Sequence, residues 1–266
     1  MSERIDKELV VRGLAPSRAK AQQLILDNKV VIDGKIVNKN NYVVSDNQEI
    51  KILDNNILKY VSRGGLKLEK AVNVFHYSMV GKTVLDIGSS TGGFTDCALQ
   101  SGASKVVAVD VGTDVMDQNL RMDSRIELHE NTNLKDLTTD IVKGIDVIVA
   151  DISFISIKLL IDKIVELNLN TDLILLIKPQ FECGRQYLAK HKGVVKDKKI
   201  HTMVLKDITQ YLTVNKFNIL GLDYSPIAGG DGNIEYLCYA SNKVLHNDII
   251  INIQEIIQNA FDNIGD

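Results

Sequence analysis

The chain has 266 residues, of which 45% are apolar and 24% charged, the balance of a folded soluble protein. The net charge of −3 argues against nucleic-acid binding over the whole surface. No apolar run reaches the roughly 18 residues that cross a bilayer, and the charged first eight residues lack a signal core, so we expect a cytoplasmic protein. Cys97, Cys183 and Cys238 lie far apart, so neither a metal site nor a disulfide framework is expected.

The first 53 residues predict a small domain of two helices followed by a short sheet. Apolar residues at helical spacing indicate a helix over residues 3–13 that stops at Gly13, and Ser17 is suited to cap a second helix. Asp33-Gly34 is typical of a tight hairpin turn between two short strands. Two further strands are expected within residues 43–52. A domain of this size could barely fold alone.

Basic residues are concentrated in this small domain. Residues 1–40 contain eight Lys or Arg and five Asp or Glu, a local charge of +3 in a chain of negative net charge. The runs Arg4–Leu14, Ser17-Arg18 and Val30–Gly34 resemble the S4 RNA-binding domain over about residues 3–53. That resemblance implies phosphate contacts, which contribute affinity more than sequence choice. The residues expected to contact RNA are Arg4, Arg18, Lys20, Lys29 and, just beyond the domain, Arg63; the alternative is that these side chains only solvate the surface.

The remainder of the chain predicts an α/β domain. We assign residues 1–53 to the small domain, 54–62 to a linker and 63–266 to the large domain. Strands and helices alternate from residue 82, and the first five strands are mostly continuous apolar runs, as in parallel sheets covered on both faces. The expected strands are Thr83–Ile87, Val106–Asp110, Ile126–His129, Val147–Ala150, Leu173–Ile177, Asn218–Asp223 and Ile234–Tyr239.

The order of these elements favours one fold. A helix is expected around residues 200–214, whereas residues 224–233 suit only a hairpin, so the last strand should be antiparallel. A seven-stranded, mostly parallel sheet of this kind resembles the Rossmann-like class I S-adenosylmethionine-dependent methyltransferases. The tail, residues 247–264, repeats apolar residues at helical spacing and is expected to pack on the sheet.

A glycine-rich turn after the first strand predicts a cofactor site. Glycines at this place permit a tight turn and close backbone approach to a ligand. Ser90 replaces the second glycine of a dinucleotide motif, and Asp86 precedes Gly88 by two residues, where an acid can pair with the ammonium of S-adenosylmethionine. Asp110 could accept ribose hydroxyls. The expected cofactor-binding residues are Asp86, Gly88, Ser89, Ser90, Gly92, Gly93, Phe94, Asp110 and Asn133; a nicotinamide cofactor and a turn that only reverses the chain are the alternatives.

The segment after the fourth strand helps to choose the reaction. Amino-group methyltransferases usually place two prolines there, but this chain has Asp151-Ile152-Ser153-Phe154. Carbon-5 methyltransferases use a cysteine nucleophile, often after proline, and none of the three prolines precedes a cysteine. These absences favour methylation of an oxygen.

Four charged residues support that interpretation. Lys67 precedes the first strand, Asp151 and Lys178 end the fourth and fifth strands, and Glu235 lies in the last strand. Ligands of such sheets collect at the carboxyl ends of the strands, so the two middle residues should converge near the methyl donor. The Lys-Asp-Lys-Glu order resembles the FtsJ-type ribose 2′-O-methyltransferases, which implies catalytic roles for all four. Each could instead be an ordinary surface or helix-capping residue.

Longer motifs extend the resemblance over nearly the whole chain. Residues 60–68, 86–94, 178–182 and 232–235 are similar to the TlyA family, whose members methylate cytidine 2′-hydroxyls in small- and large-subunit ribosomal RNA. The resemblance implies ribosomal RNA or ribosomal subunits as partners and no membrane partner, with the oligomeric state undetermined. A non-catalytic ribosome-binding or assembly factor and a membrane-active haemolysin are the alternatives. Lys178 is expected to take or steer the hydroxyl proton.

Overall fold

The computed structural model describes residues 2–26, 28–53, 59–184, 187–188, 193–243 and 249–264. Contacts divide the chain into two compact units, Met1–Ser62 and Arg63–Asp266, which we describe separately. Of the predicted linker, residues 54–58 lie outside the described residues. No helix in the described ranges has the length and hydropathy needed to span a bilayer.

The first unit combines short strands with two helices. Its described elements are β1 (Ser2–Arg4), α1 (Ile5–Val11), α2 (Arg18–Leu26), β2 (Val30–Ile32), β3 (Lys35–Val37), β4 (Val43–Ser45) and β5 (Ile50–Ile52). Strands β3, β2 and β5 form one antiparallel sheet, and β1 pairs with β4 in a second. The side chains of Ile5, Leu9, Leu24, Ile25 and Val30 are completely buried between these elements.

Two expectations for this unit are confirmed and one is wrong. Helix α2 follows Ser17, whose hydroxyl accepts a hydrogen bond from the Lys20 amide, and the hairpin turn has positive φ at Asp33 and Gly34. The first helix, expected from residue 3, begins at Ile5. Residues 2–4 are instead a strand, because their backbone pairs with β4, 40 residues further along the chain.

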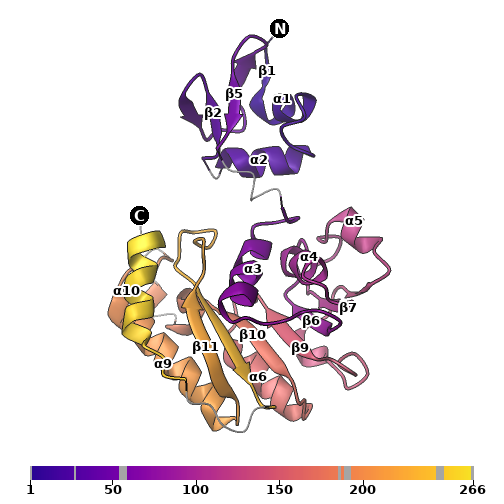
Figure 1. Ribbon diagram of the computed structural model, residues 1–266, viewed down its shortest axis with the longest axis vertical. Coiled ribbons are helices and arrows are strands. Elements are labelled where there is room, and N and C mark those ends of the chain that lie inside the picture. Colours follow the sequence, from indigo (N-terminus) through magenta and orange to yellow (C-terminus); the bar gives the residue numbers. More distant parts are fainter. Residues whose placement is uncertain are drawn as a thin grey trace. The chain divides into compact units, whose positions relative to one another are not determined.

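The second unit is a seven-stranded sheet covered by helices (Figure 1). Its described helices are α3 (Gly64–Val74), α4 (Gly93–Gln100), α5 (Gln118–Arg121), η2 (Leu134–Asp136), α6 (Ile157–Glu166), α7 (Pro179–Glu182), α9 (Lys198–Val214) and α10 (Ile253–Ile264). Its strands are β6 (Thr83–Ile87), β7 (Lys105–Val109), β8 (Ile126–His129), β9 (Val147–Ala150), β10 (Asp172–Ile177), β11 (Asn218–Tyr224) and β12 (Tyr236–Ser241). The tail helix α10 is shorter than expected; residues 249–252 precede it, and residues 247–248 lie outside the described part.

The strand order is β11-β12-β10-β9-β6-β7-β8. Strands β6 to β10 pair in parallel, whereas β12 is inserted between β10 and β11 and runs antiparallel to both. The expected antiparallel last strand is thus confirmed, although it begins at Tyr236 rather than Ile234. The sheet has the mixed architecture predicted for the methyltransferase class.

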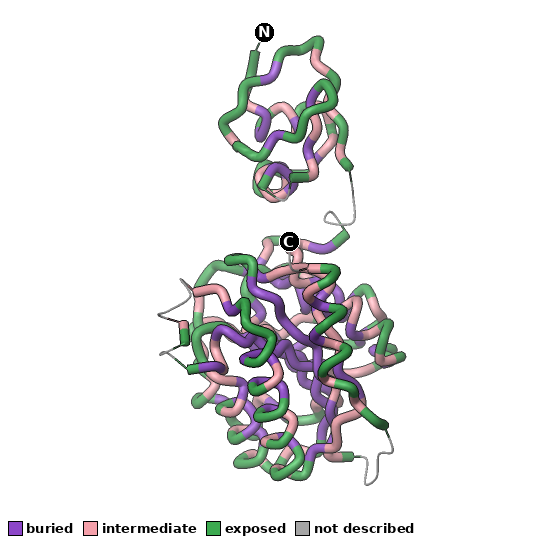
Figure 2. The backbone as a smooth tube through the Cα atoms, turned by 90° about the vertical axis from the view of Figure 1, so that its left-hand side faces the viewer, coloured by how far each residue is buried: buried purple, intermediate pink, exposed green. Residues whose placement is uncertain are grey.

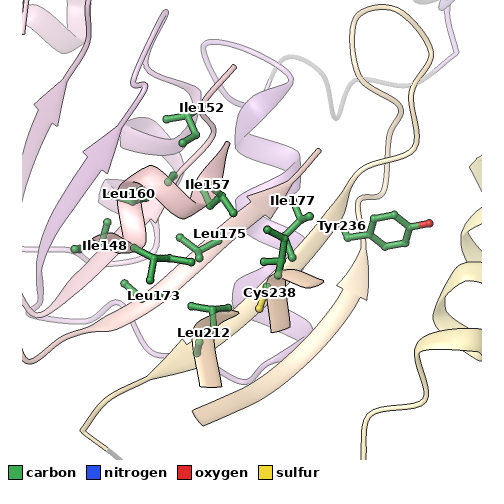
Figure 3. Packing of buried hydrophobic residues seen from close by; sticks show 14 of the residues in the cluster. Ile148, Ile152, Ile157, Leu160, Leu173, Leu175, Ile177, Leu212, Tyr236 and Cys238 are labelled. Carbon is green, nitrogen blue, oxygen red and sulfur yellow. The ribbon is translucent and has the colours of Figure 1, made fainter. Parts of the chain in front are cut away.

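Alternate strand residues face two separate layers of helices. On one side Leu85, Ile148, Leu173 and Leu175 join a core with residues of α6, α9 and α10. Figure 3 shows side chains of β9, β10 and α6 in this core, including Ile148, Leu160 and Leu175. The strands β6, β7, β9, β10 and β12 are buried along most of their length, whereas the edge strands β8 and β11 are mostly half-buried. Figure 2 shows that the helices alternate between buried and exposed residues. This two-sided burial explains the continuous apolar runs in the sequence.

Candidate active site

Four charged side chains that are remote in sequence meet at one edge of the sheet. Lys67 Nζ lies 2.7 Å from Glu235 Oε2 and 3.5 Å from Asp151 Oδ2. Lys178 Nζ lies 2.5 Å from Asp151 Oδ1. Asp151 therefore joins the two lysines, and Lys67 joins the two carboxylates. We call Lys67, Asp151, Lys178 and Glu235 the tetrad; the structure brings its four members together, while their catalytic role stays a prediction.

The topology of the sheet explains this convergence. Asp151 and Lys178 directly follow the parallel strands β9 and β10, so both lie at the carboxyl edge. Glu235 directly precedes β12, which is antiparallel, and Tyr236 pairs with Ile177 at the end of β10. An antiparallel strand begins where its parallel neighbours end. The position of Glu235 at the same edge therefore depends on the reversed direction of β12.

Lys67 reaches the site from helix α3. The buried residues of this helix, Lys67, Leu68 and Ala71, follow the spacing of one inward face. Gly65 is also buried. The lysine side chain is 10% exposed, so its charge is held inside the protein rather than in solvent.

The paired charges stabilise one another against burial. Burial opposes the positive charge of Lys67, but the carboxylates of Asp151 and Glu235 outweigh it and raise the lysine pKa above its ordinary value. Burial also opposes the negative charge of Asp151, yet Lys67 and Lys178 lower its pKa. The Asp151–Lys67 pair is therefore ionised throughout the neutral pH range.

Two polar side chains that the sequence analysis did not select support the tetrad. Ser153 Oγ accepts a hydrogen bond from Lys178 Nζ at 2.8 Å. Gln180 Nε2 donates to Glu235 Oε1 at 3.3 Å. Both residues lie within two positions of a tetrad member, in the Asp151-Ile152-Ser153 and Lys178-Pro179-Gln180 runs. Their positions as polar residues just after the ends of two strands could have identified Ser153 and Gln180 in the sequence.

The glycine-rich turn lies next to the tetrad. Gly88 has a φ of +79°, and a Cβ there would lie 2.9 Å from the carbonyl oxygen of Asp151, so only glycine fits. Ser90 has a φ of +48°, and its amide donates to Asp110 Oδ2 at 2.8 Å. Asp110 Oδ1 accepts from the Gly112 amide at 2.7 Å. Each carboxylate oxygen has a second lone pair, so Asp110 can still accept ribose hydroxyls.

Asp86 is completely buried behind this turn. Its Oδ2 accepts a hydrogen bond from the Thr95 hydroxyl at 2.6 Å, a partner that the sequence analysis did not identify. Its Oδ1 and the buried hydroxyl of Ser89 have no hydrogen-bond partner among the described residues. Burial raises the pKa of Asp86 to about 7, although the Thr95 hydrogen bond opposes the rise. An incoming cation would stabilise the ionised form of this carboxylate.

A cavity of about 500 Å³ opens in front of the turn. Of the predicted cofactor-binding residues, those that line it are Gly88, Ser90, Asp110 and Asn133, and Asp151 of the tetrad forms part of the same wall. Phe154, which is 88% exposed, also lines it.

The other predicted cofactor-binding residues lie behind this cavity. Asp86, Ser89, Gly92, Gly93 and Phe94 are not on its wall; Gly93 and Phe94 are buried in helix α4. Gly92 has a φ of +94° and packs against Leu120, where a Cβ would lie 2.3 Å from Cδ1. These residues therefore shape the turn from behind.

The predicted RNA-contacting residues differ in their surroundings. Arg4 and Arg18 are half-exposed and both contact the carboxylate of Asp6. Lys20 Nζ donates to the backbone carbonyl of Tyr60. Lys29 and Arg63 are partly exposed, the former between α2 and β2 and the latter at the N-terminus of α3 in the second unit.

Comparisons with known proteins agree with this architecture. The FtsJ-like methyltransferase family model matches residues 60–242, and the S4 domain model matches residues 3–50. The first match covers more than half of the chain and includes the glycine-rich turn and all four members of the tetrad.

Curated relatives resemble the chain over both domains. The 16S/23S rRNA (cytidine-2′-O)-methyltransferase TlyA of Mycobacterium tuberculosis is 37% identical over 89% of this chain and 88% of its own. Hemolysin A of Brachyspira hyodysenteriae is 40% identical over 89% of this chain and 98% of its own. A solved structure of a candidate hemolysin from Streptococcus thermophilus is 36% identical, covers 98% of this chain and 96% of that one, and has a TM-score of 0.77.

The family follows from these matches together with the fold. An S4 domain precedes a methyltransferase sheet, and the tetrad lies at the carboxyl edge expected for that sheet. The sequence similarity extends over most of each relative's length. The chain is therefore a methyltransferase that belongs to the FtsJ-like family, within the TlyA and haemolysin A group, and it carries an S4 domain.

Proposed function

We propose that this protein transfers a methyl group from S-adenosylmethionine to the 2′-hydroxyl of a cytidine ribose in ribosomal RNA. The observation that carries the proposal is the tetrad, in which two lysines and two carboxylates meet beside a cavity lined by the glycine-rich turn. The name of the M. tuberculosis relative supplies both the cytidine and the ribosomal RNA.

The residues of the turn fit the proposed methyl donor. Asp110 offers carboxylate oxygens at the cavity wall for ribose hydroxyls, and Asn133 lies on the same wall. The unpartnered, buried Oδ1 of Asp86 favours a positive group at the turn. S-adenosylmethionine, when bound, supplies an electrophilic methyl group on a positively charged sulfur. The glycine at position 88 keeps the backbone close to Asp151, so the donor site and the tetrad share one wall.

In this proposal Lys178 takes the hydroxyl proton as a neutral amine, after its own ammonium proton has been released to solvent. A ribose hydroxyl is a poor nucleophile and must lose its proton as it attacks. The ion pair with Asp151 and the hydrogen bond to Ser153 hold Lys178 Nζ in one place, which favours orientation of the hydroxyl toward the cavity. Lys67 balances the charge of Asp151 and Glu235, and so keeps Asp151 in position to hold Lys178.

The partner in this proposal is structured ribosomal RNA, held in part by the S4 unit. Its half-exposed arginines are suited to phosphate contacts. Such a substrate implies that the protein works in the cytoplasm. A non-catalytic assembly factor would need the fold and the RNA-binding unit but not the buried tetrad, so the tetrad favours the enzyme.

The test is methyl transfer to purified ribosomal subunits. The protein is incubated with labelled S-adenosylmethionine and bacterial small or large subunits, and ribose methylation is mapped in the recovered RNA. We expect label on the 2′-oxygen of a cytidine, and none with the Asp151→Asn variant. Binding of the subunits without transfer by the native chain would favour the assembly factor, and label on a base would contradict the proposed chemistry.

A further inference from the structure

The S4 unit contains a buried carboxylate that binds two arginines at once. Asp6 is completely buried on helix α1. Its Oδ1 accepts from Arg4 Nε at 3.0 Å, and its Oδ2 accepts from Arg4 Nη2 at 3.1 Å and Arg18 Nε at 2.8 Å. Gln22 Nε2 donates to the same Oδ2 at 3.0 Å. Four hydrogen bonds therefore hold one carboxylate group, three of them at Oδ2.

These hydrogen bonds keep Asp6 ionised. Burial alone would raise the pKa of Asp6, but hydrogen bonds from Arg4, Gln22 and Arg18 outweigh burial and hold it far below its ordinary value. The carboxylate is therefore ionised at neutral pH. Two guanidinium charges against one carboxylate leave the group with a net positive charge.

The arginines have donors left over after they bind Asp6. Arg18 donates to Asp6 only through Nε, so neither of its terminal nitrogens has an acceptor in the described part of the chain. Nη1 of Arg4 likewise has no acceptor there. The side chains are 41% and 52% exposed. Guanidinium groups fixed at their inner edge and exposed at their outer edge present forked donors that match phosphate oxygens.

A third arginine of the same unit shows the contrasting arrangement. Arg12 Nε donates to Glu8 at 2.7 Å, Nη1 to the Gln48 carbonyl at 2.7 Å, and Nη2 to the carbonyls of Ser45 and Asp46 at 3.2 Å. Its side chain is 24% exposed. All three nitrogens of this guanidinium are used by the fold, so Arg12 is a structural arginine and a matched control.

We propose that Asp6 is a positioning residue that holds Arg4 and Arg18 as one binding site for a phosphodiester of the RNA substrate. This inference rests on the proposed function, since it assumes that the S4 unit binds RNA. Side chains that are already held in place lose less conformational freedom when the phosphate binds. A single phosphate that bridges both arginines would contribute affinity and fix the orientation of the unit on the RNA.

The experiment measures binding of the full-length chain to purified large-subunit and small-subunit ribosomal RNA between 50 and 200 mM KCl. We expect Arg4→Gln/Arg18→Gln to weaken binding about tenfold or more and to lower the slope of log K against log salt by about one. Asp6→Asn should weaken binding by a similar factor. In the background without both arginines, Asp6→Asn should change neither affinity nor slope. Arg12→Gln should leave the slope unchanged.

A second variant leaves the buried Asp6 unchanged, so its result does not depend on whether the Asp6→Asn chain folds. Arg18→Lys keeps the charge of a half-exposed side chain, but an ammonium cannot bind Asp6 and a phosphate through a planar fork. We expect it to weaken binding nearly as much as Arg18→Gln, and to raise KM for RNA with kcat unchanged. Native affinity in both Arg18→Lys and Asp6→Asn would overturn the positioning role. An equal loss of RNA affinity from Asp6→Asn in the presence and in the absence of the two arginines would also overturn the positioning role. Failure of the native chain to bind ribosomal RNA would instead overturn the proposed function itself.

Discussion

Each unit of this protein contains one aspartate that joins two cations, and the two groups differ in exposure and in the kind of cation. Asp6 joins Arg4 and Arg18, whose side chains are 41% and 52% exposed. Asp151 joins Lys67 and Lys178, whose side chains are 10% and 8% exposed.

The difference matches two kinds of chemistry. An arginine keeps its proton at all physiological pH values and offers a rigid fork of donors, which suits a lasting contact with a phosphate. A lysine can exchange its proton when its surroundings favour the neutral form, which suits the removal of a proton from a hydroxyl. In our proposals, an aspartate that joins two cations therefore serves RNA binding in the first unit and proton transfer in the second.

The largest effect is expected at Lys178, where substitution by arginine tests whether the second unit needs a lysine or only a positive charge. Lys178→Met and Lys178→Arg should both lower single-turnover methyl transfer about 10³-fold, because neither side chain can take a proton. Binding of S-adenosylmethionine, measured by calorimetry, should stay within a few-fold of native. An arginine variant that keeps more than a tenth of the native rate would mean that a positive charge suffices and that Lys178 is not the base.

The next effect concerns the second carboxylate of the tetrad. Glu235→Gln removes the 2.7 Å ion pair with Lys67 but keeps the shape of the side chain. We expect a transfer rate about 10²-fold lower, within the range for acid–base residues, and an unfolding free energy lower by about 2 kcal/mol, because Asp151 still compensates Lys67. The matched control is Glu166→Gln, which breaks an exposed pair with Lys163 and should change neither quantity.

Asp86 extends the comparison, because it is a completely buried carboxylate that has no ion pair with any residue the structure describes. With a pKa of about 7, a roughly eightfold larger fraction is ionised at pH 7.5 than at pH 6. We expect S-adenosylhomocysteine to bind more tightly at pH 7.5 by about the same factor, and Asp86→Asn to bind it with no such dependence. An asparagine variant that keeps the native pH profile would remove Asp86 from ammonium binding.

The raised pKa of Asp86 also predicts how the unfolding free energy changes with pH. Its pKa in the folded chain lies above the unfolded value near 3.8, so the folded state binds more protons between about pH 4 and pH 7. Its contribution to the unfolding free energy therefore falls as the pH rises through that window. Urea titrations should show this fall in the native chain and its loss in Asp86→Asn.

The smallest effect is expected at Ser153, which holds Lys178 at 2.8 Å. Ser153→Ala should slow transfer about threefold, the effect of one net hydrogen bond of about 0.7 kcal/mol, because Asp151 still holds the amine. In a Lys178→Met background the serine substitution should have no further effect. An equal effect in both backgrounds would show that Ser153 does not act through Lys178.

Much of the second unit could be predicted because burial on both faces of a sheet leaves a strong pattern. The runs at residues 83–87, 147–150 and 173–177 are apolar at almost every position, and charged residues at their ends mark the carboxyl edge. Residues Asp151 and Lys178 could therefore be located at that edge. Strand β1 had no such pattern, because its three residues are polar and gain their structure from pairing with β4.

The supporting contacts could not be predicted, for a related reason. Thr95 with Asp86, and Arg18 with Asp6, are polar side chains whose partners are set by the packing of separate elements. The periodic apolar pattern that predicts helices and strands gives no information about such a pair. The pairing of β5 with β2 rather than with β4 was hidden in the same way, since three-residue strands carry too few side chains to specify their neighbours.

The reversed last strand has a consequence for the order in which the enzyme is completed during synthesis. Strand β12 lies in the sheet between β10 and β11, and Glu235 directly precedes it. Domains fold as the chain leaves the ribosome from its N-terminus. The glycine-rich turn and three members of the tetrad are synthesised well before Glu235, so the tetrad of a nascent chain remains incomplete until residues 236–241 have emerged and paired with β10 and β11.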